Sequence, residues 1–122
     1  MVLTRLFVYG TLRKYGSANH FLQNAYLLKY NLKLPGFSLY HCGAYPIAIE
    51  SQEDKNTIIG DIYEVEENNL DTLDAYEGEE YFRKQIPQIN CQIYLARDRS
   101  LAKKLPLVPH GDWLLYVRNG NR

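Results

Sequence analysis

The sequence predicts a small fold that is rich in β-strands and has few helices, and three observations lead to that prediction. Apolar and aromatic residues alternate with polar ones in several separate segments, which is typical of strands. Tyrosine, which favours strands, occurs 11 times among the 122 residues. Only residues 68–77 carry a full set of helix signals. At this length we expect one domain, residues 1–122, with a sizeable buried core.

The first predicted strand is the apolar run at residues 6–9. Gly10 ends this run, because glycine permits a sharp turn or a close approach of a ligand. The hydroxyl of Thr11 can bind a neighbouring backbone group in the turn. A strand that opens into such a turn exposes backbone N–H groups, which can hold an anionic oxygen. From these residues alone, an ordinary strand followed by a turn is the preferred interpretation.

The next segments continue the strand pattern after one short helix. Ser17 is expected to cap a helix over residues 18–23. Residues 25–34 carry apolar side chains at alternate positions, which predicts a strand with one buried face that ends at the following Pro-Gly turn. Further strands are expected at residues 37–40, 45–49, 57–65, 82–89 and 91–95.

The helix predicted at residues 68–77 has a recognisable start and end. Asn68 is a favourable N-cap, and Gly78 is a typical C-terminal stop. After the last strand, residues 97–111 are basic and contain two prolines, so we expect a surface loop or a short helix there. Residues 113–117 are apolar enough to pack back onto the body of the protein.

Glu77 is the most informative residue of the predicted helix. Leu70, Leu73 and Glu77 follow the i, i+3, i+7 spacing and therefore share one helix face. If the leucines face the core, the Glu77 carboxylate does too, and burial would raise its pKa toward the range that suits a general acid or base. The alternative is a solvated residue at a frayed helix end, or an ion pair with Arg83 or Lys84. Periodicity alone does not decide between these interpretations, whereas Glu79 and Glu80 are expected to be solvated.

Charge and motif content exclude several classes of protein. Lys and Arg together number 14, as do Asp and Glu, so the basic surface of a nucleic-acid-binding protein is not expected. The three histidines lack the spacing of metal ligands, and no phosphate-loop motif is present, so we expect no metal and no cofactor. The apolar N-terminal run is too short for a signal peptide or a membrane span, and the two cysteines form no paired motif. We therefore expect a soluble cytoplasmic protein with no membrane partner.

Several motifs in their order along the chain resemble the gamma-glutamylcyclotransferase family. The resemblance covers most of the chain and is closest to the small single-domain branch that includes gamma-glutamylamine cyclotransferases and bacterial members. Some members of that branch lack the acidic residue at the helix end, and this chain has it as Glu77. The motifs that carry the resemblance are Tyr9-Gly10-Thr11-Leu12-Arg13, Gly43-Ala44-Tyr45-Pro46, Gly60-Asp61-Ile62-Tyr63, the run from Leu73 to Arg83, and Gly111-Asp112-Trp113.

The resemblance implies a fold, a reaction and a site. The implied fold is α+β, a small mixed twisted sheet curled into a barrel with a few short helices outside. The implied reaction releases 5-oxoproline from a small gamma-glutamyl compound without metal or cofactor, with Glu77 as general acid and base. The resemblance also implies a protein that is a monomer or a weak homodimer. The implied substrate-binding residues, most of them through their backbone, are Tyr9, Gly10, Thr11, Leu12 and Tyr81.

Two other functions remain open at this point. The first is a ligand-binding or interaction domain that keeps the fold without turnover. The second is hydrolysis of a gamma-glutamyl amide by water, which would release free glutamate. The identity of the leaving amine is not determined by the sequence, and residues 50–56 and 97–111 are the loops expected to set it.

Overall fold

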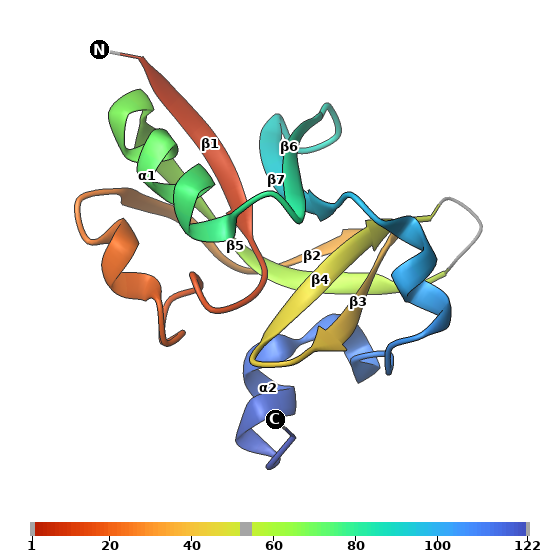
Figure 1. Ribbon diagram of the computed structural model, residues 1–122. Helices are drawn as coiled ribbons and strands as arrows, with labels where there is room; N and C mark the ends of the chain where they lie inside the picture. The colour runs from red at the N-terminus through yellow and green to blue at the C-terminus, as the bar shows by residue number, and fades with distance from the viewer. Residues whose placement is uncertain (1, 52–54, 122) are drawn as a thin grey trace.

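The strands of this computed structural model, which describes residues 2–51 and 55–121, form a curled five-stranded sheet and a separate two-stranded hairpin (Figure 1). Within these residues, two α-helices and three short 3₁₀-helices lie outside the strands. The strands are β1 (Leu3–Val8), β2 (Tyr26–Pro35), β3 (Phe37–Cys42), β4 (Tyr45–Glu50), β5 (Thr57–Glu66), β6 (Tyr81–Ile86) and β7 (Cys91–Ala96). The helices are η1 (Asn19–Leu22), α1 (Glu67–Glu77), η2 (Arg99–Lys103), η3 (Pro109–Gly111) and α2 (Trp113–Arg118).

Strand β1 is the central strand of the five-stranded sheet, whose order is β2-β5-β1-β7-β6. It pairs antiparallel with β5 and parallel with β7. Side chains on both of its faces are buried, because Leu6 and Val8 lie in one core cluster and Phe7 lies in the other. A strand that is covered on both faces has consecutive apolar residues in its sequence, and residues 6–9 show this pattern.

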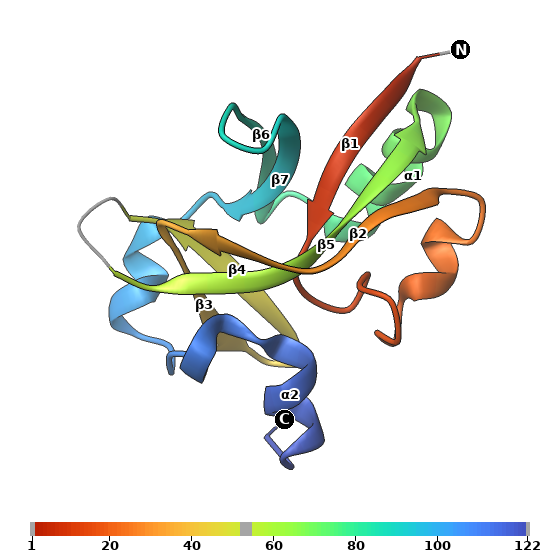
Figure 2. The same ribbon diagram turned by 180° about the vertical axis from the view of Figure 1, so that it is seen from behind.

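The β3–β4 hairpin crosses one side of the curled sheet, as the two opposite views in Figures 1 and 2 show. The segment before η3 joins it, since the Val108 N–H donates to the Leu39 carbonyl at 2.9 Å. In both views α1 lies beside β1 and α2 lies at the other end of the molecule. The expected α+β class, with a curled mixed sheet and short helices outside it, is confirmed.

Helix α1 ends where the sequence predicts and begins slightly earlier. Gly78 follows it with a φ of +83°, and its N–H donates to the Asp74 carbonyl at 2.9 Å. The predicted N-cap was wrong, because Glu66 occupies that position and makes no side-chain cap. Leu70 and Leu73 are buried, so the predicted helix face does point toward the core.

Two further predictions about local structure are corrected, and a third is tested only in part. The cap position of the first short helix is Ala18 instead of Ser17, and it makes no side-chain hydrogen bond. Strand 82–89 ends earlier than expected, at Ile86, because a turn follows it. Residues 52–54 of the predicted loop 50–56 lie outside the described residues.

Strand β2 lacks the buried face that its alternating pattern predicts. Tyr26 and Tyr30 are 65% and 47% exposed, and within the strand only Leu34 is buried. β2 lies at the edge of the sheet, and irregularities between Leu27 and Leu32 break its pairing with β5. Because each irregularity shifts the side-chain alternation, a regular apolar pattern does not remain on one face.

The C-terminal part of the chain packs back as expected. Residues 97–111 contain η2 and η3, and Trp113 at the start of α2 is 3% exposed. Within residues 2–51 and 55–121, no helix is both long and apolar enough to span a membrane.

Candidate active site

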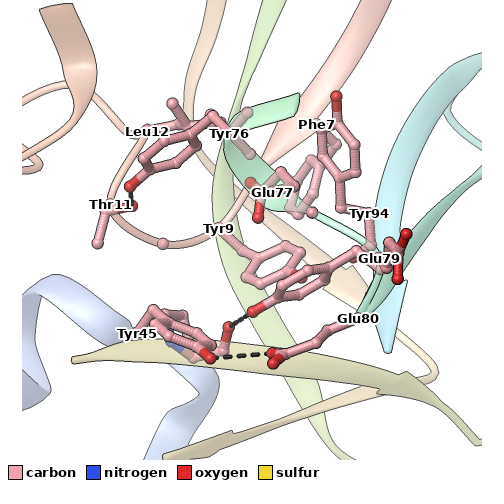
Figure 3. A pocket seen from close by; sticks show the side chains of 15 residues that line it. Phe7, Tyr9, Thr11, Leu12, Tyr45, Tyr76, Glu77, Glu79, Glu80 and Tyr94 are labelled. Carbon is pink, nitrogen blue, oxygen red and sulfur yellow. Dashed lines mark hydrogen bonds between the residues drawn. The ribbon is translucent and has the colours of Figure 1, made fainter. Parts of the chain in front are cut away.

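A pocket of about 580 Å³ lies where the loop after β1, the end of α1 and the start of β4 meet (Figure 3). It contains every residue that the sequence analysis named as catalytic or substrate-binding. Its lining residues are Phe7, Val8, Tyr9, Gly10, Thr11, Leu12, Tyr45, Pro46, Tyr76, Glu77, Gly78, Glu79, Glu80, Tyr81 and Tyr94.

The turn after β1 lines this pocket, and three of its backbone N–H groups have no acceptor among the described residues. Among the described hydrogen bonds, none uses the N–H of Gly10, Thr11 or Leu12 as donor. The carbonyls of the same turn are engaged, since Gly10 accepts from the Arg13 N–H at 3.1 Å and Thr11 accepts from the Ala18 N–H at 2.8 Å. A turn whose carbonyls are bound and whose N–H groups are available is suited to hold an anionic oxygen.

Gly10 is required by the close approach of β4. A Cβ atom at this position would lie 2.7 Å from Cγ of Pro46, well inside van der Waals contact. The absence of a side chain therefore lets the turn and the start of β4 meet and form one wall of the pocket.

Glu77, the last residue of α1, has a half-buried carboxylate that extends into the pocket above the ring of Tyr9 (Figure 3). No ion pair or hydrogen bond to this carboxylate exists among the described residues. Burial, with the nearby negative charge of Asp74, raises the pKa of Glu77 from 4.5 to about 7. A carboxyl group with this pKa can both accept and return a proton near neutral pH.

The alternative in which Glu77 forms an ion pair is wrong. Arg83 binds Asp74, with Nε 2.7 Å from Oδ1, and Lys84 binds Glu50, with Nζ 2.6 Å from Oε1. Both candidate cations are thus engaged elsewhere, so no cation of the described residues 2–51 and 55–121 forms an ion pair with Glu77.

The two tyrosines predicted at the site have structural hydrogen bonds. The Tyr9 hydroxyl donates to the Tyr94 carbonyl at 2.6 Å, and the Tyr81 hydroxyl donates to the Pro46 carbonyl at 3.0 Å. Burial and the Glu77 charge raise the pKa of Tyr9 above its usual value, so its hydroxyl stays neutral. Tyr81 lines the pocket but does not donate to Glu77, and its hydroxyl instead anchors the start of β4.

Sequence reasoning missed several residues of the pocket wall. Tyr76 shares a hydrogen bond of 3.0 Å with the Thr11 hydroxyl, and the Tyr45 hydroxyl donates to Glu80 at 2.9 Å. That hydrogen bond to Glu80 raises the pKa of Tyr45 to about 12. Glu79 and Glu80 are exposed, as expected, but they also line the pocket. The high tyrosine content was the available signal, since five of the lining residues are tyrosines.

The described part of the chain offers no cluster of three or more His, Cys, Asp or Glu side chains that is able to hold a metal ion. The pocket itself presents one carboxyl group with a raised pKa, two exposed carboxylates, three backbone N–H groups and neutral phenols. Such a set can move a proton and stabilise a developing negative charge on oxygen.

Comparisons with known proteins place most of this chain in one family. The family model described as "Gamma-glutamyl cyclotransferase, AIG2-like" matches residues 6–115. The gamma-glutamylcyclotransferase family protein YtfP of Escherichia coli K12 is 32% identical over 112 residues, which are 90% of this chain and 96% of the relative. The solution structure of ytfP from Escherichia coli superposes with a TM-score of 0.69 at 33% identity and covers 91% of this chain and 96% of its own.

A relative with a more specific name matches a shorter region. The gamma-L-glutamyl-butirosin B gamma-glutamyl cyclotransferase of Niallia circulans is 36% identical over 98 residues, 75% of this chain and 58% of that protein. The family match spans most of the chain and includes the turn after β1 and the end of α1. This chain therefore belongs to the gamma-glutamylcyclotransferase family.

Proposed function

We propose that this protein releases 5-oxoproline from a small gamma-glutamyl compound, with Glu77 as the general base and acid. The observation that carries the proposal is the unpaired Glu77 carboxylate, with a pKa of about 7, in the same pocket as the free N–H groups of Gly10, Thr11 and Leu12. This arrangement supplies the two things that an intramolecular acyl transfer requires, a proton acceptor and donors for an oxyanion.

The reaction exchanges one amide bond for another within the gamma-glutamyl group. The α-ammonium of the substrate loses a proton to Glu77, and the free amine attacks the γ-carbonyl carbon. A tetrahedral oxyanion forms, and it collapses as the bond between the γ-carbon and the leaving nitrogen breaks. Glu77 returns the proton to that nitrogen, and the ring nitrogen, which still carries two hydrogens after its attack, passes one of them by way of Glu77 to the departing amine. The products are the 5-oxoproline lactam and the protonated amine, and no water is consumed.

The protein mainly has to fold the substrate into a ring-closing conformation. Amine and carbonyl belong to one molecule, so correct orientation replaces the recruitment of a second reactant. The free N–H groups of the turn are available for the substrate's α-carboxylate and for the oxyanion. Loss of one oxyanion donor typically lowers the rate by about 10²–10³-fold, so the backbone of this turn matters as much as the Glu77 side chain.

The relatives support the gamma-glutamyl half of the substrate and leave the amine half open. The name of the Niallia circulans relative specifies gamma-L-glutamyl-butirosin B as its substrate. Every substrate of this reaction shares the gamma-glutamyl group and the leaving nitrogen, which the turn and Glu77 would contact, whereas the rest of the leaving amine lies farther from them.

The test is product identification with a panel of gamma-glutamyl amides and chromatography that separates 5-oxoproline from glutamate. We expect 5-oxoproline and free amine in equal amounts from the wild type. Glu77→Gln should lose at least about 10²-fold in rate, the lower range for removal of a general base. Glu67→Gln, the same change at the other end of α1, is the matched control and should retain full activity.

Three outcomes would contradict the proposal in different ways. Free glutamate in place of 5-oxoproline would indicate hydrolysis by water. Binding of gamma-glutamyl compounds with no product would indicate a binding domain that keeps the fold. Full activity of Glu77→Gln would remove Glu77 from the mechanism.

A further inference from the structure

The residue that follows the donor turn carries a fully buried guanidinium. The side chain of Arg13 is 2% exposed, and its partner Asp61 is 0% exposed. The site chemistry proposed above uses neither residue. Arg13 is nonetheless adjacent to Leu12, the last of the three residues with free N–H groups.

Arg13 joins its turn to three other segments of the chain. Its Nε and Nη2 donate to the Asp61 carboxylate on β5, each at 3.4 Å. Nη2 also donates to the Asn31 side chain on β2, and Nη1 donates to Asp112 at 3.2 Å. Asp112 is the N-cap of α2, where its carboxylate also accepts from the Leu115 N–H at 3.2 Å.

Asp61 closes the loop that contains the turn. It pairs with Val8, the last residue of β1, so the loop begins beside it. Asp61 Oδ2 also accepts from the Lys14 N–H at 2.9 Å, so the loop ends at the same residue. The segment with the three free donors is thus fixed at both ends to one position of β5.

We propose that Arg13 is a positioning residue, which holds the N–H groups of Gly10, Thr11 and Leu12 at the distance from Glu77 that the reaction needs. Through Asp112, α2 takes part in the same restraint. The catalytic consequence rests on the proposed function, whereas the ordering of the turn does not. A forked guanidinium is required for this role, because a lysine ammonium at the same place cannot bind Asp61 and Asp112 with fixed geometry.

The rival explanation is that the Arg13–Asp61 pair only adds stability. The test therefore compares Arg13→Lys with Ile86→Ala, a core variant at the end of β6 farthest from Tyr81. Lysine keeps the positive charge beside Asp61, so the variant is expected to fold. Each of the two variants is measured at the same number of degrees below its own melting temperature, so that a difference in stability does not affect the comparison.

Two readouts are measured on both variants: kcat and KM for 5-oxoproline release, and ¹⁵N relaxation of the amides of Gly10, Thr11 and Leu12. Arg13→Lys should lower kcat by about 10²-fold, the loss typical of a misplacement of about 1 Å, and it should loosen these amides. Ile86→Ala should stay within a few-fold of wild type with the turn unchanged. Asp112→Asn keeps a good N-cap but removes one charge from Arg13, and it should give an intermediate effect.

Equal effects of Arg13→Lys and Ile86→Ala on both readouts would overturn the proposal. If the wild type itself forms no 5-oxoproline, the proposed function fails, and the relaxation data alone decide whether Arg13 orders the turn. If Arg13→Lys does not fold, the comparison of Asp112→Asn with wild type takes its place, and an unchanged turn and kcat in that variant would contradict the role of the network.

Discussion

Asp74 and Glu77 lie on the same face of α1 near its end, but their carboxylates differ in their partners. Among the described residues, hydrogen-bond donors contact the carboxylate of Asp74 and none contacts that of Glu77. Asp74 accepts from Arg83 Nε and from the Tyr94 hydroxyl, at 2.7 and 2.6 Å. Burial alone would raise the pKa of Asp74, but these bonds and the Arg83 charge outweigh it and lower the pKa. The pKa of Glu77 is raised by burial and by the charge of Asp74 itself. Two carboxyl groups whose pKa values are shifted in opposite directions suit separate roles: Asp74 stays ionised and binds Arg83 and Tyr94, and Glu77 has the pKa that the proposed proton transfer needs.

The first prediction concerns this pair. Asp74→Asn removes a negative charge near Glu77, so ionisation of Glu77 becomes easier and its pKa falls. The acid limb of the pH profile of kcat/KM should therefore move to lower pH. A profile measured on both proteins between pH 5 and 9 checks this, and a shift to higher pH would contradict the assignment of the limb to Glu77.

The second prediction links Glu77 to stability. Its pKa is higher in the folded state than in the unfolded state, so its contribution is fully favourable below about pH 4.5 and is lost as pH rises toward about 7. Since one pKa unit corresponds to about 1.4 kcal/mol, ionisation at high pH destabilises the fold by about 3 kcal/mol. Glu77→Gln should therefore gain stability relative to wild type between pH 5 and 8.5.

Urea unfolding at the two limits, pH 5 and pH 8.5, and at several values between them measures the difference. The gap in unfolding free energy between Glu77→Gln and wild type should widen with pH and level off above about 7. A gap that is the same at both pH values would show that Glu77 is not desolvated in the folded protein.

The third prediction concerns the contact between the donor turn and β4. Gly10→Ala places a methyl group 2.7 Å from Cγ of Pro46, so the turn must move. We expect a fall in kcat/KM of about 10²-fold, as for other misplaced catalytic groups. Pro46→Ala in the same protein removes the atom that the new methyl group would meet, and it keeps the backbone carbonyl that binds Tyr81. The double variant should recover most of the activity, and equal loss in the single and double variants would contradict this explanation.

The fourth prediction concerns the leaving amine. Three carboxylates line the pocket, Glu77, Glu79 and Glu80, and no Lys or Arg is found among its described lining residues. A gamma-glutamyl amide whose leaving group carries a positive charge, in addition to the α-ammonium of the substrate, should therefore react faster than an amide of the same length with an uncharged leaving group. Glu79 and Glu80 are exposed, so together they should raise the ratio of the two rates by about fivefold or less, since exposed ion pairs contribute up to about 1 kcal/mol.

Competition between the two amides measures this preference for the wild type and for Glu79→Gln combined with Glu80→Gln. The double variant should show little preference, and the wild-type preference should weaken as salt is added. A preference that is equal in both proteins and independent of salt would assign the selection to other groups.

The sequence predicted the parts of this protein that depend on local chemistry. The apolar run at residues 6–9 forms the buried end of β1, although the strand begins earlier, at Leu3, and ends at Val8; Gly78 ends α1 as predicted. The helix spacing correctly placed Glu77 on the face of Leu70 and Leu73. These features follow from short-range periodicity and from the conformational freedom of glycine, both of which are visible in one stretch of sequence.

The parts that the sequence did not predict depend on contacts between distant segments. The exposure of β2 follows from its edge position and its irregular pairing, which no alternation of residues reveals. Tyr45 and Tyr94 reach the pocket from β4 and β7, and the Arg13 network joins the loop after β1 to β2, β5 and α2. A single sequence does not specify which residues of two distant segments lie opposite each other, so these contacts can be seen only in the structure.

The most direct test of the account is the pH dependence of kcat/KM for 5-oxoproline release by the wild type and by Glu77→Gln. The account predicts that the wild-type value rises with pH through a pKa of about 7, as Glu77 becomes a base, and that the variant has at most about a hundredth of that activity with this limb absent. A variant that keeps the same limb and the same rate would contradict the central role of Glu77.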